Sequence, residues 1–302
     1  MRVDSPERFC RRGSQGVRMN RIGIIQGRLS ASVDGKIQCF PKETWSEEFT
    51  KARAAGLQCL EWVFGRDGAS VNPLATADGI TRMRQLSQRT RVEVRSVCAD
   101  YFMDSPLLRV TETVRQQRLQ RLQWLLTHCA AAGIARIVLP FVDRSEIRTD
   151  NELALAAASV QAATPTATEL GVELHLETSL PPERFRELLA QLDPNAVKVN
   201  YDIGNSAALG YDPDAEFAAY GERIGSVHVK DRVLHGSTVP LGQGHADFRT
   251  CFAALRSLGY RGDFILQVAR GREGQEVSWA RHNRQFVFRH WRQARQAATV
   301  LQ

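Results

Sequence analysis

The sequence predicts a single-domain closed barrel of eight parallel strands alternating with helices, the (β/α)8 TIM-barrel fold of the α/β class. Eight strand-like runs alternate with helical runs, which is the pattern of a parallel sheet with right-handed crossovers. The chain has 302 residues, a length that barrels of this kind commonly reach as one domain. No GxGxxG motif follows the first strand-like run, which argues against an open dinucleotide-binding sheet.

The boundaries of the helical runs support this alternation. The run that begins with ETWSEEF has an acidic first turn and ends at Gly56, and two later runs end at Gly133 and Gly171. A strand-like run follows each glycine at once. We expect Pro165 to kink or divide the helix that ends at Gly171, because proline cannot donate the helical hydrogen bond. The expected strands lie near residues 21–28, 57–64, 92–99, 134–141, 172–178, 196–202, 224–230 and 262–269.

The last predicted helix, VSWARHNRQFVFRHWRQARQ, carries an aromatic stripe. Trp279, Phe286, Phe288 and Trp291 lie on or near one side of it. We interpret the stripe as packing against the barrel and not as a cofactor site. The same helix is a candidate surface for a homodimer, since barrels often pair through their outer helices.

Composition and charge argue against several classes of protein. No apolar run approaches the roughly 18 to 20 residues of a membrane span, so we expect a soluble protein with no membrane partner. Residues 1–18 contain arginines but no apolar core of a secretory signal, and we interpret them as a disordered basic extension before a barrel over residues 19–302. Met19 is then the expected functional start.

Cysteine usage and net charge point to a cytoplasmic protein without a nucleic-acid partner. The six cysteines show no CxxC spacing, which is typical of reduced thiols in the cytoplasm. The net charge of +7 comes from arginines spread over the helices, with no single basic block. Binding to nucleic acid is therefore not indicated.

Polar residues end four of the predicted strands at positions that a barrel core normally rejects. They are Glu177 in VELHLET, Asp202 in VKVNYD, His228 in SVHVK and Gln267 in FILQVA. Strand side chains alternate between two faces, so these groups point inward if helices cover the apolar faces. Burying unpaired carboxylates costs several kcal/mol, so a bound ion or a paired network is needed to keep them charged. Oxygen and nitrogen ligands of this kind suit one divalent ion, Mn, Co, Mg or Zn.

A buried salt-bridge network is the alternative interpretation of this cluster. In it, Lys198 or Lys230 would neutralise the carboxylates without any metal. Lys230 points to the same side as His228, so it is also a candidate to bind an anionic oxygen or to polarise a carbonyl. His175 lies one layer below Glu177 and is a better candidate for a hydrogen-bonding partner than for a metal ligand.

Several further polar residues lie near the expected mouth of the barrel, where TIM-barrel enzymes place their active sites. Arginines and Lys230 gather there, which would suit a small anionic substrate such as a sugar phosphate. A solvated arginine-rich surface is the plainer explanation. Asp231 and Arg232 could simply pair with each other. The predicted substrate-contacting residues are Gln26, Arg28, Glu61, His175, Asn205, Lys230, Asp231, Arg232 and Arg270.

The region from IGIIQGRLS to FILQVARG resembles the sugar phosphate isomerase/epimerase family, xylose isomerase-like barrels that also include tagatose epimerases and the endonuclease IV group. The most specific segments are LHLET, YDIGNSAALGYDP, HVKDR, LGQGHADF and GYRGDFILQ. The resemblance implies that glutamate, aspartate and histidine on strands five, six and seven bind one divalent ion together with a glutamate on strand eight. The first three match as Glu177, Asp202 and His228.

The fourth position departs from the family, because Gln267 stands where the resembling epimerases have glutamate. A carboxamide oxygen can coordinate a metal but cannot accept a proton as a carboxylate does. The resemblance implies two glutamates that exchange the proton next to the substrate carbonyl, and only Glu177 is retained. Either Glu61, Lys230 or Asp231 supplies the second acid or base, or the reaction needs one group, as in aldose–ketose isomerisation or elimination.

We therefore predict a metal-dependent isomerase or epimerase that acts on a carbohydrate, namely a ketose, a sugar acid or a sugar phosphate, through an enediolate, with Glu177 as base. A catalytically altered sugar-binding barrel and a metal-dependent lyase or dehydratase are alternatives. Endonuclease IV-like DNA repair is remote, because that group uses a histidine-rich trinuclear cluster. The matching position after strand six is Asn205, and Cys98 stands in strand three.

Overall fold

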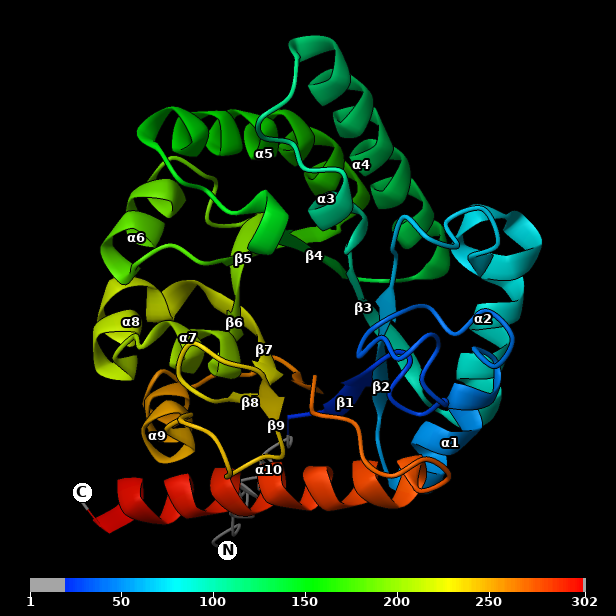
Figure 1. The fold of residues 1–302 in the computed structure, drawn as a ribbon, viewed down its shortest axis with the longest axis vertical. Helices are drawn as coiled ribbons and strands as arrows, with labels where there is room; N and C mark the ends of the chain where they lie inside the picture. The colour runs from blue at the N-terminus through cyan, green and yellow to red at the C-terminus, as the bar shows by residue number, and fades with distance from the viewer. Residues whose placement is uncertain (1–19, 301–302) are drawn as a thin grey trace, which may run out of the picture.

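In the computed structural model, which describes residues 20–300 and the side chains of residues 20–294, eight parallel strands close into a barrel. The helices form a ring outside the strands (Figure 1). The strand order around the barrel is β1-β10-β7-β6-β5-β4-β3-β2, which confirms the predicted fold. The barrel strands are β1 (Ile22–Ile25), β2 (Cys59–Val63), β3 (Glu93–Cys98), β4 (Arg136–Phe141), β5 (Glu173–Thr178), β6 (Val197–Asp202), β7 (Ile224–Val229) and β10 (Phe264–Leu266).

Each predicted strand run contains one of these strands, and the helices follow between them. A small antiparallel pair, β8 (Asp231–Arg232) and β9 (Thr238–Val239), stands apart from the barrel after β7. The helices are α1 (Glu47–Ala55), η1 (Pro73–Ala75), α2 (Ala77–Thr90), α3 (Tyr101–Asp104), α4 (Glu112–Ala132), η2 (Asp143–Ser145), α5 (Asp150–Leu170), α6 (Pro182–Ala190), α7 (Ile203–Leu209), α8 (Pro213–Tyr220), η3 (Gly221–Arg223), α9 (Phe248–Ser257) and α10 (Glu276–Val300).

Glycine ends three of the helices as predicted, whereas Pro165 does not divide the helix that contains it. Gly56, Gly133 and Gly171 adopt the left-handed conformation with φ of 79°, 77° and 64°, which favours glycine. Helix α5 runs without a break through Pro165, so division of this helix was a wrong prediction. The helix continues because its apolar face is buried along its whole length, which offsets the roughly 3 kcal/mol cost of an interior proline.

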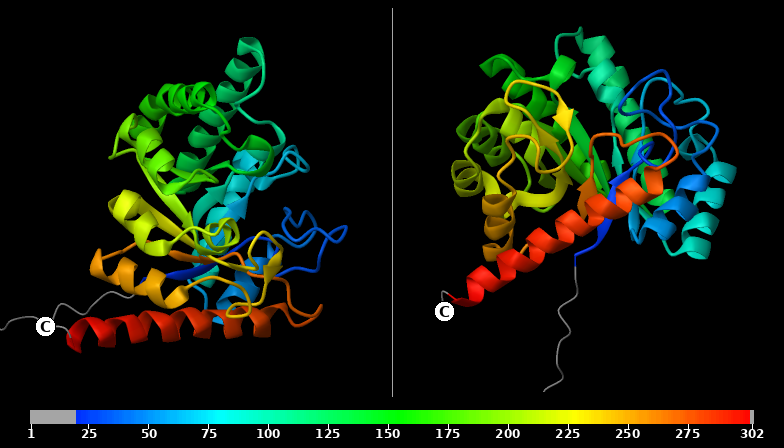
Figure 2. Two further views of the ribbon diagram at one scale, coloured as in Figure 1. Left: turned by 60° about the vertical axis from the view of Figure 1, so that its left-hand side comes forward. Right: turned by 60° about the horizontal axis from the view of Figure 1, so that its bottom comes forward.

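The aromatic stripe of α10 packs against the barrel, which confirms its predicted role. Figure 2 shows α10 as a long rod along one side of the molecule. The Trp291 ring lies 5.1 Å from the ring of Phe264 in β10, and the Phe286 ring lies 4.9 Å from that of Phe248 in α9. Edge-to-face aromatic pairs of this kind add roughly 0.5–1.5 kcal/mol beyond the area that they bury. The last helix therefore fastens the final strand to the outer layer.

Two expectations from composition can be compared with the described residues. None of the helices in residues 20–300 is long and apolar enough to cross a membrane. The five cysteines of the described part are free thiols, as the absence of CxxC spacing predicts. The basic extension over residues 1–18 and the expected start at Met19 lie outside the described residues.

Candidate metal centre and substrate pocket

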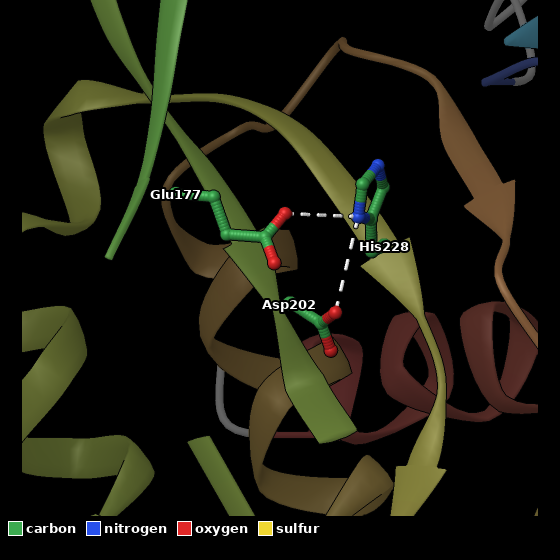
Figure 3. A group of neighbouring side chains, drawn as sticks. All are labelled: Glu177, Asp202 and His228. Carbon is green, nitrogen blue, oxygen red and sulfur yellow. Dashed lines mark ion pairs between the residues drawn. The ribbon is translucent and has the colours of Figure 1, made fainter. Parts of the chain in front are cut away.

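Three neighbouring strands bring Glu177, Asp202 and His228 together at their carboxyl ends. Glu177 comes from β5, Asp202 ends β6, and His228 comes from β7, where it is the direct register partner of Asp202. One possible ligand atom from each residue lies within 4.8 Å of the others, and all three side chains are buried (Figure 3). The strand alternation that predicted inward-pointing side chains therefore places them in one cluster.

His228 presents one ring nitrogen to the two carboxylates. Its buried Nδ1 has no hydrogen-bond partner among the described residues, although it lies 3.2 Å from Glu177 Oε2 and 3.9 Å from Asp202 Oδ2. Nε2 lies 2.7 Å from Glu61 Oε1 and can donate its hydrogen there, so in the neutral ring the lone pair would be on Nδ1, which faces the carboxylates. A buried nitrogen without a partner between two carboxylate oxygens is the donor set that a divalent cation requires.

The electrostatics of His228 fit the same interpretation. Burial by itself would lower the pKa of His228, but the surrounding carboxylates, with Glu61 first among them, raise it well above its usual value. In the protein without an ion, the protonated ring therefore supplies a positive charge to the carboxylate cluster. A metal ion would take over this charge and release the proton.

Glu61 supports the site from behind and does not reach the pocket. Its side chain is fully buried, and Oε2 accepts a hydrogen bond of 2.7 Å from Ser96 Oγ while Oε1 faces His228. Burial favours the neutral form, yet the neighbouring His228 holds the pKa of Glu61 below its usual value. Glu61 is thus a charged group that orients His228, and this placement removes it from the candidates for a second acid or base at the substrate.

Two asparagines hold the carboxylate of Glu177. Asn200 Nδ2 donates to Oε2 and Asn205 Nδ2 donates to Oε1, each at 2.8 Å. The Asn205 backbone N–H also donates to Asp202 Oδ1 at 2.9 Å, so Asp202 caps the start of α7. Burial opposes ionisation of Asp202, but Lys230 and then His228 lower its pKa to about 2. The hydrogen bonds from Asn200 and Asn205 therefore fix the orientation of both the Glu177 and the Asp202 carboxylates.

Lys230 is the lysine that reaches the cluster. Its Nζ lies 3.0 Å from Asn205 Oδ1, 3.0 Å from Gln267 Oε1 and 3.4 Å from Asp202 Oδ2. Lys198, the other lysine considered for a salt-bridge network, donates instead to the carbonyl of Pro194. Lys230 and a protonated His228 together do not balance the three buried carboxylates of Glu61, Glu177 and Asp202, so the cluster retains room for further positive charge.

A pocket of about 720 Å³ adjoins this cluster. Three of the predicted substrate residues line it, namely Asn205, Lys230 and Arg232. Arg232 Nη1 donates to Asn205 Oδ1 at 2.9 Å, so Arg232 does not pair with Asp231 as considered from the sequence. A pocket of this size accommodates a small sugar or its phosphate.

The predicted arginine cluster at the mouth is largely engaged elsewhere. Arg28 Nε donates to the Val268 carbonyl at 2.8 Å, and its Nη1 donates to the Ile37 carbonyl. Arg270 donates to the same Ile37 carbonyl and to that of Ser30. Neither arginine lines the pocket, because both fasten the long loop after β1 to the end of β10. The sequence identified charged residues near the mouth, but it could not predict which way the side chains of Arg28 and Arg270 point.

Three other predicted residues are also engaged away from the pocket. Asp231 is buried and accepts hydrogen bonds from the backbone N–H groups of Gly242, Gly244 and Ala246. His175 is fully buried, with its ring nitrogens 2.7 Å from Ser226 Oγ and 2.9 Å from Glu173 Oε2. Gln26 is also buried, and its Oε1 accepts from the backbone N–H of Val63. The structure brings none of the three to the pocket.

Gln267, which follows β10 directly, lines the pocket and connects to two residues that the sequence did not single out. Its Nε2 donates to Gln38 Oε1 at 3.1 Å, and Gln38 Nε2 donates to Asp100 Oδ2 at 2.8 Å. Asp100 stands two residues after the end of β3, at the same barrel end as Glu177, and this position was the signal that could have found it. Gln38 lies in a long loop without periodicity, so no signal marked it.

The fold and the cluster define a class of protein, namely TIM barrels with a candidate divalent-metal site of carboxylates and imidazole at the carboxyl ends of the strands. Within that class, the family described as xylose isomerase-like TIM barrel matches residues 49–290, and the chain belongs to this family.

The relatives include named L-ribulose-5-phosphate 3-epimerases and an inosose dehydratase. The L-ribulose-5-phosphate 3-epimerase UlaE of Shigella flexneri is 26% identical, over 75% of this chain and 82% of that protein. An inosose dehydratase of Geobacillus kaustophilus is 30% identical, over 40% of this chain and 46% of that protein. The solved structure of an L-ribulose 3-epimerase is similar with a TM-score of 0.75 at 19% identity, over 94% of this chain and 98% of that chain, and this likeness shows the fold. The epimerase names confirm the predicted isomerase class.

Proposed function

We propose that this protein is a divalent-metal-dependent epimerase or isomerase of a ketose, a sugar acid or their phosphates, and that it acts through an enediolate form of the substrate. The observation that carries the proposal is His228 Nδ1, which is buried without a hydrogen-bond partner among the described residues and faces Glu177 and Asp202. The adjoining pocket of about 720 Å³ gives room for a small sugar.

Glu177, Asp202 and His228 would hold the ion, with the amide oxygen of Gln267 as a candidate fourth ligand. When bound, such an ion polarises the substrate carbonyl and thereby makes the hydrogen on the neighbouring carbon more acidic. Glu177 is the base that removes this hydrogen, because it is the carboxylate of the cluster that also lines the pocket. Asn200 and Asn205 fix the direction of the Glu177 oxygens.

Lys230 and Arg232 are the cationic groups that the pocket offers to substrate oxygens near the cluster. Charge at both residues supports binding of a hydroxyl-rich or anionic substrate, including a phosphate ester. L-Ribulose 5-phosphate and L-ribulose are the first compounds to test, since the named relatives act on sugars of this kind. We also propose a cytoplasmic location, supported by the free cysteines, while the homodimer and the basic extension stay predictions.

A dehydratase is the second candidate function. Gln267 removes the carboxylate that the resembling epimerases have on strand eight, and the relative from Geobacillus kaustophilus is an inosose dehydratase. Elimination of water needs one base next to the carbonyl, a role that Glu177 can fill alone. An endonuclease-like trinuclear cluster receives no support, because the one candidate metal group among the described residues contains a single histidine.

Elemental analysis of the wild-type protein and of Asp202→Ala tests the metal part of the proposal. We expect about one equivalent of Mn, Co, Mg or Zn in the wild type and its loss in the variant, with an unchanged circular dichroism spectrum. Ketoses and their phosphates are then incubated with the metal-loaded protein in D₂O, and NMR follows epimer formation and deuterium uptake. Absence of metal after reconstitution, or binding of sugars without any turnover, would favour the sugar-binding barrel.

A further inference from the structure

A series of hydrogen bonds connects Lys230, at the candidate metal site, to the carboxylate of Asp100. Lys230 Nζ donates to Gln267 Oε1 at 3.0 Å, and Gln267 Nε2 donates to Gln38 Oε1 at 3.1 Å. Gln38 Nε2 then donates to Asp100 Oδ2 at 2.8 Å. We name Lys230, Gln267, Gln38 and Asp100 together the amide bridge. All four of its residues line the pocket.

The amide bridge has one consistent direction, from an ammonium donor at one end to a carboxylate acceptor at the other. Each glutamine uses its oxygen toward Lys230 and its nitrogen toward Asp100, so both amide orientations follow from the charged ends. Cys98 Sγ donates to the other oxygen of Asp100 at 3.0 Å. The carboxyl group of Asp100 is therefore held in place at the pocket wall.

We propose that Asp100 is the second proton-transfer group of this enzyme and that it takes the part which the strand-eight glutamate has in the resembling epimerases. This inference rests on the proposed function. Position 267 has no carboxylate in this protein, but Asp100 provides one at the other end of the amide bridge. Two proton-transfer groups, Glu177 and Asp100, are therefore still present. Glu177 and Asp100 then flank a common pocket.

The surroundings of Asp100 suit a group that exchanges a proton near neutral pH. Burial first, and then the negative charges of Glu177 and Glu61, raise the pKa of Asp100 to about 6, although the hydrogen bonds from Cys98 and Gln38 work in the opposite direction. A carboxyl group with such a value can both donate and accept a proton near neutrality. An exposed aspartate, with its usual pKa near 4, would hold few protons there.

The proton balance of the proposed step is closed. The Glu177 carboxylate removes the hydrogen next to the carbonyl as a proton, and the electron pair of the broken C–H bond enters the enediolate. The Asp100 carboxyl group then gives its proton to the same carbon from another side, which forms the new C–H bond and restores the carbonyl. Glu177 ends protonated and Asp100 ends charged. Proton exchange with water resets both groups, and the reverse reaction exchanges their parts.

The amide bridge also explains why a glutamate at position 267 and an aspartate at position 100 are not compatible. A glutamate at position 267 would direct an acceptor oxygen at Gln38 Oε1, and the Gln38 amide would have to turn over. Its oxygen would then face the Asp100 carboxylate, which is also an acceptor. An asparagine at position 100 relieves this conflict, because its side-chain nitrogen can donate to the turned Gln38.

The variant Asp100→Asn tests the proposal with a readout that a merely structural residue would not produce. Wild type and variant are incubated in D₂O with whichever of L-ribulose 5-phosphate and L-ribulose the wild type epimerises. We expect epimer formation to fall by at least 100-fold, while deuterium uptake at the same carbon, which needs only Glu177 and solvent, stays within about tenfold. Asp78→Asn, an exposed aspartate in the first turn of α2 and away from the pocket lining, is the matched control and should keep both rates.

The double variant Asp100→Asn/Gln267→Glu moves the carboxylate to the other end of the amide bridge. We expect it to regain at least tenfold in epimer formation over Asp100→Asn. Epimerisation by Asp100→Asn at close to the wild-type rate would overturn the inference alone, as would an equal loss of deuterium uptake and epimer formation. A metal-loaded wild type that neither exchanges nor epimerises any of the ketoses and ketose phosphates tested would overturn the proposed function, and the inference with it.

Discussion

Glu61 Oε1 and His228 Nε2 lie 2.7 Å apart in the barrel interior, and both side chains are fully buried. Glu61 comes from β2 and His228 from β7, so the bond crosses the barrel and joins residues 167 positions apart in the chain. Because this bond sets which nitrogen of His228 carries the hydrogen, it also determines which nitrogen is free for a metal.

Replacing Glu61 by glutamine tests this dependence. An amide can turn its NH₂ group toward the ring and so favour the wrong tautomer of His228. We expect the Kd of Mn²⁺ to rise by about 10- to 100-fold with the fold intact, as measured by isothermal titration calorimetry. The exposed residue Glu47 offers a control, since Glu47→Gln should leave the Kd unchanged. Equal Kd values for Glu61→Gln and the wild type would contradict the orienting role.

The base assigned to Glu177 predicts a specific kinetic defect. In Glu177→Gln we expect deuterium uptake into the substrate to fall by about 10²- to 10⁴-fold, because no carboxylate remains to remove the hydrogen. The amide oxygen keeps part of the metal-binding capacity, so the assay is made at saturating metal. NMR in D₂O measures the exchange rate directly. Retention of wild-type exchange would assign the base to another residue.

Glu48 predicts a stability that depends on pH. Burial raises the pKa of Glu48 from 4.5 to about 7, against the hydrogen bonds from Gly27, Ser30 and Leu29. The folded state therefore binds more protons than the unfolded state between these two pH values, and the free energy of unfolding falls as pH rises through this window. At roughly 1.4 kcal/mol per pH unit, the loss attributable to Glu48 reaches up to about 3 kcal/mol at pH 7 and above.

Urea unfolding at pH 5 and pH 7.5 measures this effect. Glu48→Gln should reduce the difference between the two pH values by the contribution of Glu48, while Glu47→Gln on the exposed face of α1 should leave it unchanged. The variant itself loses hydrogen-bond acceptors, so its stability should be lower than that of the wild type at pH 5. A pH difference that is the same in all three proteins would show that Glu48 does not titrate in this window.

Asp231 holds the loop after β9 in place, so we expect its replacement to lower the free energy of unfolding. Its two oxygens accept from Gly242, Gly244 and Ala246, so Asp231→Ala leaves three backbone N–H groups without this partner. We expect a loss of about 1–3 kcal/mol in the free energy of unfolding, measured by urea denaturation. Asp247→Ala removes only the cap of α9 and should cost about 1 kcal/mol. A smaller loss of unfolding free energy in Asp231→Ala than in Asp247→Ala would contradict the role of Asp231 in holding this loop.

The sequence predicted the barrel and the cluster of Glu177, Asp202 and His228 because both depend on local periodicity. Eight alternating runs imply the strand order, and the two-residue repeat directs Glu177, Asp202 and His228 to the interior at one end. The same repeat could not tell whether Glu61 faces the pocket or the back of His228. That distinction depends on barrel depth and on a contact across the barrel, which no local pattern encodes.

The amide bridge escaped prediction for a related reason. Gln38 lies in the irregular loop between β1 and α1, where neither periodicity nor a turn motif gives a side chain its direction. Asp100 carried a positional signal only, because it follows β3 closely. Arg28 and Arg270 were predicted to bind an anion from their charge, yet they donate to backbone carbonyls that a loop of this length leaves without partners.

The attachment of the β1 loop to the end of β10 also has a consequence for synthesis on the ribosome. Arg28 emerges 240 residues before its partner Val268, and Gln38 emerges 229 residues before Gln267. A nascent chain that has completed seven strands therefore contains the loop after β1 but lacks the residues of the β10 end that this loop contacts. Contacts between such distant positions form late and slow the final steps of folding. Active-site assembly should thus coincide with release of the C-terminal helix, and a chain truncated before β10 should bind no sugar.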